Sequence, residues 1–131
     1  MASEFINALS VYGADVKGAL GRMLNKEEMY SKFLRKFRED KSMDELRRIF
    51  TKSEADRSPE DFQQIFHLAH TVKGVAANLG LTSIANESSE ICEKTRSGNT
   101  DPDALKGLGE MFYRLDEDYR ELIGILNRVL Q

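Results

Sequence analysis

The stretch Phe66-His67-Leu68-Ala69-His70-Thr71-Val72-Lys73-Gly74-Val75-Ala76-Ala77-Asn78-Leu79-Gly80 carries the strongest pattern in this chain of 131 residues. If the stretch is helical, with about 100° per residue, its apolar side chains fall within a stripe roughly 80° wide. The stripe consists of Ile65, Leu68, Val72, Val75 and Leu79. We therefore expect an amphipathic helix that turns this stripe toward the core.

The opposite side of the same helix is unusually bare. His70 lies almost diametrically opposite the apolar stripe, with Lys73, Gly74 and Ala77 around it. A glycine in the middle of a helix costs about 1 kcal/mol relative to alanine. An exposed imidazole beside a patch without bulky side chains suggests that a large partner comes close to it.

The spacing His70-x-x-Lys73-Gly74, with Gly80 ten residues after the histidine, resembles the signature of histidine-containing phosphotransfer (HPt) domains. Residues 76–79 and Ala69 resemble that family as well. The resemblance implies that His70 accepts a phosphoryl group from the aspartate of a receiver domain and passes it to another receiver.

Both ends of the motif helix are marked in the sequence. Ser58-Pro59-Glu60-Asp61 combines a capping serine, a proline at the first helical position and acids in the first turn. Gly80 is well placed to adopt the left-handed conformation that ends a helix. We expect the helix to run from Pro59 to about Leu79.

Before this helix, the pattern predicts two short helices and a longer, interrupted one. The first lies within residues 3–12 and ends at Gly13, and the second starts at Asp15. Asn25 is expected to cap a third helix, whose aromatic residues Phe33 and Phe37 point to the core. The apolar stripe changes phase near residues 40–42, which predicts a kink or a break, with Ser42 as a new cap.

After the motif helix, Thr82 is expected to open a helix with a small-residue inner face, which ends at a turn over residues 97–100. Asp101-Pro102 is expected to start the last helix, whose apolar residues alternate steps of three and four. Short loops between long amphipathic helices predict an all-α fold: an antiparallel, up-and-down four-helix bundle with short accessory N-terminal helices. We expect residues 1–131 to form a single domain of this kind.

Composition narrows the classes of function. The net charge of −3 gives no reason to expect nucleic acid or a membrane surface as a partner. One cysteine, Cys92, cannot form an internal disulfide and fits a reducing compartment. Neither a transmembrane run nor the pattern of a signal peptide is found. We expect a cytoplasmic protein and a monomer.

The residues around His70 suit phosphoryl transfer. A neutral imidazole is a good nucleophile toward an acyl phosphate, and the ammonium of Lys73 can neutralise the phosphoryl oxygens. Gly74 leaves access for the partner. We expect the docking surface to include Gln63, Phe66, His67, Ala77 and Asn78.

No magnesium site is evident near His70, so we expect no cofactor on this chain and magnesium on the partner receiver. His67 with His70 falls short of the four ligands of a structural zinc site. Nothing resembles a nucleotide-binding motif, so a stoichiometric phosphocarrier is expected rather than an autonomous kinase or ATPase. Cys92 is expected to be a small core residue rather than a reactive thiol.

One position departs from a subgroup of the family. The phosphotransfer domain of chemotaxis-type histidine kinases usually carries a glutamate twenty-two residues after the histidine, and Cys92 stands there. This favours a relay carrier that exchanges phosphoryl groups with receivers, including that of a hybrid sensor histidine kinase and a response regulator. Two alternatives stay open: the chemotaxis-type domain, and a non-catalytic helical adaptor that only docks receivers.

Overall fold

The computed structural model describes residues 3–96, 101–103 and 105–130. Within them the chain forms only helices, and none is both long and apolar enough to cross a membrane. The helices are α1 (Glu4–Tyr12), α2 (Val16–Arg22), α3 (Glu27–Glu39), α4 (Ser42–Thr51), the 3-10 turn η1 (Glu54–Asp56), α5 (Pro59–Asn78), α6 (Thr82–Thr95) and α7 (Leu108–Val129).

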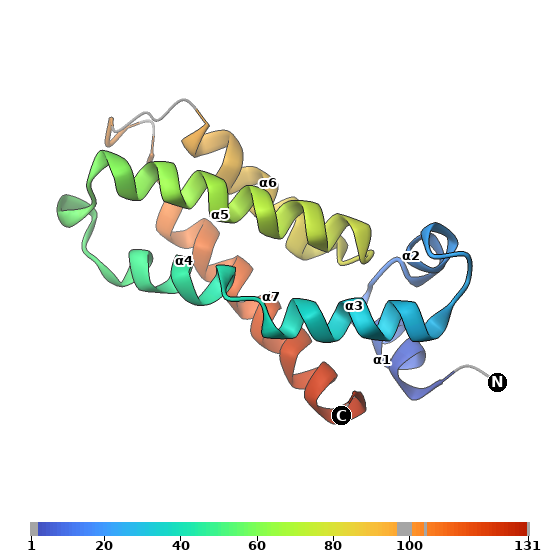
Figure 1. The fold of residues 1–131 in the computed structure, drawn as a ribbon. Coiled ribbons are helices and arrows are strands. Elements are labelled where there is room, and N and C mark those ends of the chain that lie inside the picture. The colour runs from blue at the N-terminus through green and yellow to red at the C-terminus, as the bar shows by residue number, and fades with distance from the viewer. Residues whose placement is uncertain (1–2, 97–100, 104, 131) are drawn as a thin grey trace.

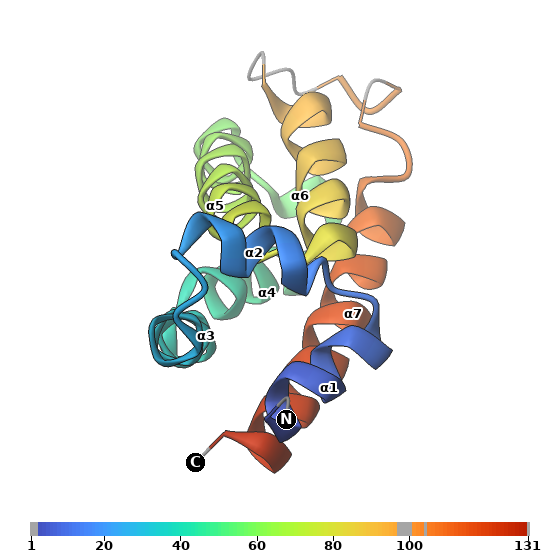
Figure 2. The ribbon, with the colours of Figure 1, turned by 90° about the vertical axis from the view of Figure 1, so that its right-hand side faces the viewer.

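The helices pack as an antiparallel bundle, in which α3 with α4, then α5, α6 and α7 run in alternating directions. Helices α3 and α4 follow one another along one edge, α5 returns above them, α6 packs beside α5, and α7 crosses behind (Figure 1). Seen from the end, α1 lies along α7 and α2 lies across the C-terminal end of α5 (Figure 2). The predicted up-and-down bundle with accessory N-terminal helices is confirmed.

The motif helix α5 begins and ends as its sequence predicts. The Ser58 hydroxyl accepts a hydrogen bond from the Asp61 N–H (3.1 Å), and the Asp61 carboxylate accepts one from the Ser58 N–H (2.9 Å). This reciprocal pair satisfies donors that the helix itself leaves without partners. At the other end Gly80 has φ +72°, the left-handed conformation that glycine adopts without strain.

The buried stripe of α5 differs in part from the prediction. Val75 is 39% exposed, whereas Ala69 and Ala76 are fully buried together with Ile65 and Val72. The reason is the neighbour: α6 packs along α5, and small side chains at 69 and 76 allow that close approach. The core therefore turns toward the alanines, and Val75 is left at the edge.

Two predictions about helix caps need correction, and a third prediction is not tested by the described residues. The break after α3 is confirmed, but Ser42 is the first residue of α4 rather than its cap. The N-cap residue is Lys41, whose side chain makes no capping bond, and the Asp40 carboxylate before it accepts a hydrogen bond from the Ser42 N–H at 2.7 Å. Asn25 does not cap α3, because this residue has φ +60° and the helix starts after Lys26 without a side-chain cap. The predicted turn over residues 97–100 lies outside the described residues.

The last helix starts one and a half turns later than predicted. Asp101 does begin a turn, since its backbone oxygen accepts from the Leu105 N–H at 3.1 Å. Gly107 then adopts φ +84°, which an α-helix cannot contain, and the regular helix begins at Leu108. From there the predicted seam is buried: Leu108, Phe112, Leu115, Tyr119, Leu122 and Leu126.

Candidate functional site

His70 lies on the solvent side of α5, as predicted. Its side chain is exposed, and its imidazole makes no hydrogen bond within the described part of the chain. The ring stacks on Phe66, one turn earlier, with ring centroids 5.9 Å apart and an interplanar angle of 15°. This contact limits the rotation of the imidazole and leaves both ring nitrogens available to an incoming group.

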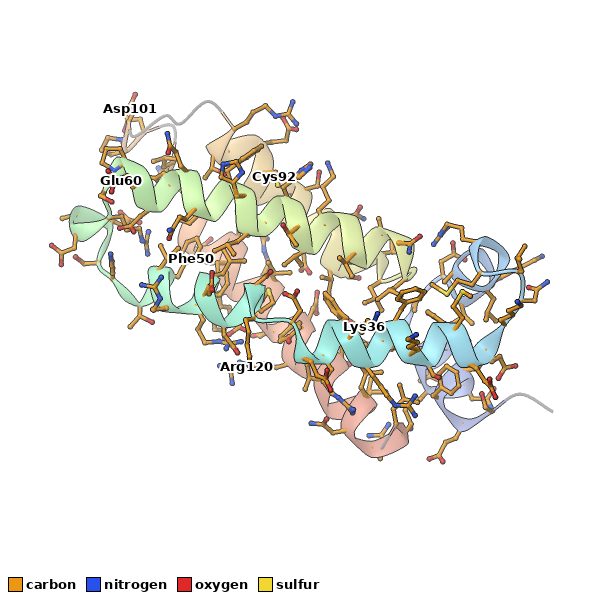
Figure 3. The ribbon with its side chains drawn as sticks, viewed as in Figure 1. Lys36, Phe50, Glu60, Cys92, Asp101 and Arg120 are labelled. Carbon is orange, nitrogen blue, oxygen red and sulfur yellow. The ribbon has the colours of Figure 1, made fainter. Side chains whose placement is uncertain are left out.

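Phe66 contacts both the exposed His70 ring and the buried Cys92 of α6. The Phe66 side chain is half-buried, and its backbone oxygen accepts a weak hydrogen bond from the Cys92 thiol of α6, with S···O 3.8 Å. Cys92 itself is 1% exposed, and burial raises the pKa of its thiol while the nearby Lys73 ammonium opposes that effect. A buried thiol of raised pKa is a packing residue rather than a nucleophile. Figure 3 marks Cys92 on the α6 side of α5.

Lys73 lies one turn beyond His70 and is half-buried. Among the described residues its ammonium has neither a hydrogen-bond partner nor an ion-pair partner, and its charge acts on Cys92. An ammonium held at this place without a carboxylate of its own can meet an anion that arrives at His70.

Gly74 leaves open space beside the histidine. A Cβ built on Gly74 meets no atom within 4 Å, so the packing of the chain does not require glycine at this position. Gln63, His70 and Ala77 are spaced seven residues apart and lie on one line of the helix. All three are exposed, and the exposed Gly74 and Ala77 carry no bulky side chain, so the bare strip predicted beside His70 exists.

The other expected docking residues are placed in different ways. His67 is exposed and meets the Phe66 ring edge to face, with centroids 5.4 Å apart. Asn78 is exposed at the end of α5, and its backbone oxygen is already bound by Arg22. The structure thus brings Phe66 and His67 to the histidine and places Asn78 two turns away, beside α2.

Sequence reasoning missed an apolar edge beside the strip. Phe33 was expected in the core, but it is 36% exposed on α3 and faces a shallow groove shared with α5. Val75 and Gly74 line the same groove, and the Lys36 ammonium lies 5.5 Å from the centre of the Phe33 ring. Lys36 is marked on α3 in Figure 3. The signal was a second apolar column on α3, formed by Met29 and Phe33 next to the buried Tyr30 and Leu34.

Among the described residues, no carboxylate forms a hydrogen bond or an ion pair with the His70 imidazole. Glu93 pairs with Arg96, and Glu90 lies 4.0 Å from the Arg114 guanidinium, so both acids of α6 near Cys92 are turned to other partners. Within the described ranges no three His, Cys, Asp or Glu side chains are placed to hold a metal ion. The arrangement offers a free nucleophile, a nearby cation and room for a second protein.

Comparison with known families adds one finding. The family model described as "Hpt domain" matches residues 28–121, which include α5, α6 and most of α7. No curated protein and no solved structure matches the chain significantly.

Proposed function

Because the chain belongs to the Hpt domain family, a family of histidine phosphotransfer in phosphorelays, we propose that His70 is the phosphorylated residue. The observation that carries this proposal is the pairing of an exposed, unbonded imidazole with the open space over Gly74. An imidazole that only decorated a solvated surface would not need a bare strip along two turns of helix.

The reaction is an exchange between two protein side chains. A nitrogen of the neutral His70 imidazole attacks the phosphorus of a receiver's aspartyl phosphate. The N–P bond forms as the P–O bond to the aspartyl carboxyl breaks, and the carboxylate leaves with the electron pair. The phosphorylated imidazole then loses the proton of its second nitrogen to water. Transfer to a second receiver is the reverse of these steps with a new aspartate.

The surrounding residues supply position and charge. Stacking on Phe66 limits the rotation of the His70 ring and so helps to position it for the incoming phosphoryl group. The Lys73 ammonium lies within reach of the equatorial phosphoryl oxygens and offsets their charge. We propose that magnesium stays with the receiver, which holds the aspartate. The chain then acts as a carrier that turns over once per phosphoryl group.

The docking surface combines the predicted strip with the apolar edge. Phe33 and Val75 offer exposed apolar surface next to Gly74, and Lys36 and Lys73 add positive charge at its border. A receiver surface with apolar residues and a rim of carboxylates fits this face. The partners proposed are the receiver of a hybrid sensor histidine kinase and that of a response regulator.

One alternative is disfavoured by the geometry. A chemotaxis-type domain needs a carboxylate that activates the histidine toward ATP, and Cys92 instead donates to the Phe66 backbone oxygen. The adaptor alternative predicts docking without transfer. Phosphorylation of the chain by a receiver therefore distinguishes the proposed carrier from the adaptor.

The test uses a panel of receiver domains phosphorylated on aspartate. The wild-type chain should accept the phosphoryl group from at least one of them, and His70→Gln should accept none while it keeps its fold by circular dichroism. His67→Gln is the matched control, because it removes the neighbouring imidazole and keeps His70, and it should still become phosphorylated. Equal labelling of the wild type and His70→Gln would refute the assignment, and binding without any labelling would favour the adaptor.

A further inference from the structure

The C-terminal end of α5 is closed by side chains of α2 and α3. The last carbonyls of a helix have no partner within it. Here Arg22 of α2 donates from Nη2 to the Ala77 oxygen at 2.9 Å and from Nη2 and Nε to the Asn78 oxygen at 3.0 and 3.2 Å. The Tyr30 hydroxyl donates to the Leu79 oxygen at 2.8 Å. A guanidinium at this end also complements the negative pole of the helix.

Helix α2 is fixed at this end by direct backbone contact. The Asp15 N–H donates to the Gly80 oxygen at 2.8 Å. A Cβ at position 80 would collide with the Asp15 backbone oxygen and approach the Ala19 side chain to 3.4 Å. Gly80 therefore allows α2 to lie against the end of α5 (Figure 2). Arg22 of α2 then reaches the last carbonyl groups of α5.

Part of this closure comes from residues that precede the family match. The matched residues begin at 28, so α1, α2 and Arg22 all precede them. The bond from Tyr30 lies within the matched part, whereas the three bonds from Arg22 do not. The N-terminal helices α1 and α2 therefore lie outside the residues that the family model matches.

Arg22 also lies beside the proposed docking surface. Ala77, whose oxygen it binds, is on the His70 line of α5, two turns or about 10 Å further along. The Arg22 side chain is exposed, and its Nη1 makes no hydrogen bond within the described residues. A docked protein that covers His70 and Ala77 would meet this remaining donor at its edge.

We propose that Arg22 determines which receivers dock: it fixes the last turn of α5 and presents Nη1 to a carboxylate on the receiver. The inference rests on the proposed function, because it takes the face around His70 as the docking surface. Arg22 is a positioning and specificity residue and does not reach the reacting atoms. Its loss should therefore weaken docking and leave the transfer step unchanged.

Docking is measured separately from chemistry in the His70→Gln background, by titration with the receiver that binds this variant most tightly. Adding Arg22→Met should raise Kd about fivefold to tenfold. Arg22→Lys keeps the positive charge but loses the planar guanidinium, so its Kd should lie between those of the parent and the Arg22→Met variant. The Kd of the parent should rise more steeply with salt concentration than that of the Arg22→Met variant, because only the parent can form the ion pair between Arg22 and a receiver carboxylate. A purely structural cap would not change the salt dependence.

The matched control is Lys17→Met, which removes a positive charge from the same helix at an exposed position without a bond to α5. It should leave Kd and its salt dependence unchanged. In single-turnover transfer with His70 present, Arg22→Met should raise the half-saturating receiver concentration and keep the limiting rate within twofold.

Equal Kd values with and without Arg22, or a lower limiting rate at unchanged half-saturation, would overturn the inference. An effect of Lys17→Met equal to that of Arg22→Met would overturn it too. None of these results would touch the assignment of His70. If the wild type accepts no phosphoryl group, the proposed function fails, and the Kd titration still decides whether Arg22 contributes to docking.

Discussion

Replacing Gly74 should separate stability from transfer. Gly74 is exposed within α5, and a Cβ added there meets nothing within 4 Å, so a side chain enters open space. Alanine and glutamine both favour the helix over glycine by up to about 1 kcal/mol. In a domain of this size that gain raises Tm by about 3–5 °C. Both Gly74→Ala and Gly74→Gln should therefore unfold at higher temperature than the wild type.

Transfer should change in the opposite direction. The glutamine side chain extends from a position one turn, or about 6 Å, beyond His70, into the space that the receiver needs. We expect Gly74→Gln to slow single-turnover transfer from a phosphorylated receiver by tenfold or more, and Gly74→Ala to slow it only slightly. The measurements are thermal unfolding and the transfer time course at one receiver concentration.

The chain contains a matched control for this substitution. Gly124 is also exposed in the middle of a helix, α7, with nothing within 4 Å of an added Cβ. Gly124→Gln should raise Tm by a similar amount and leave transfer unchanged. If Gly74→Gln transfers as fast as the wild type, the open strip is not the docking surface and the reasoning fails.

Two further predictions concern charged residues, Lys73 and Glu87. Lys73→Ala and Lys73→Met should both slow transfer about tenfold, which corresponds to roughly 1.4 kcal/mol, and Lys73→Arg should keep part of the rate; a Met variant with the wild-type rate would leave Lys73 without an electrostatic role. Burial and the neighbouring Asp118 raise the pKa of Glu87 to about 8, with Glu90 acting in the same direction and Arg114 against it. The folded state therefore holds a proton that the unfolded state loses above its ordinary pKa, so stability falls as pH rises from about 4.5 to 8. Glu87→Gln should remove this loss, with a gain of about 1 kcal/mol at pH 8 after allowance for solvent screening and none at pH 4; urea unfolding at both pH values measures it, and an equal effect at both would contradict the assignment.

Local signals in the sequence predicted the motif helix well. The capping residues Ser58 and Asp61 and the glycine at position 80 act over one turn, and nothing distant competes with them. The exposure of His70 was also predicted correctly. His70 lies on the side of α5 opposite the apolar stripe, so it stays exposed although the buried face is centred closer to Ala69 and Ala76 than expected.

Features that depend on neighbouring helices were not predicted. Val75 and Phe33 are apolar and were assigned to the core, yet no helix of the described chain covers them fully. The start of α7 at Leu108 depends on Gly107, whose left-handed conformation prevents a continuous helix from Asp101 onward. Arg22 could not be connected with Ala77 and Asn78, because that contact spans more than fifty residues.

Mapping the phosphoryl group on the wild-type chain tests the central claim most directly. After incubation with a phosphorylated receiver, the chain should carry one phosphoryl group, on the peptide that contains residue 70. The modification should be labile in acid and stable in base, as a phosphoramidate is. A phosphoryl group on another residue, or one that survives acid as a phosphate ester does, would contradict the account.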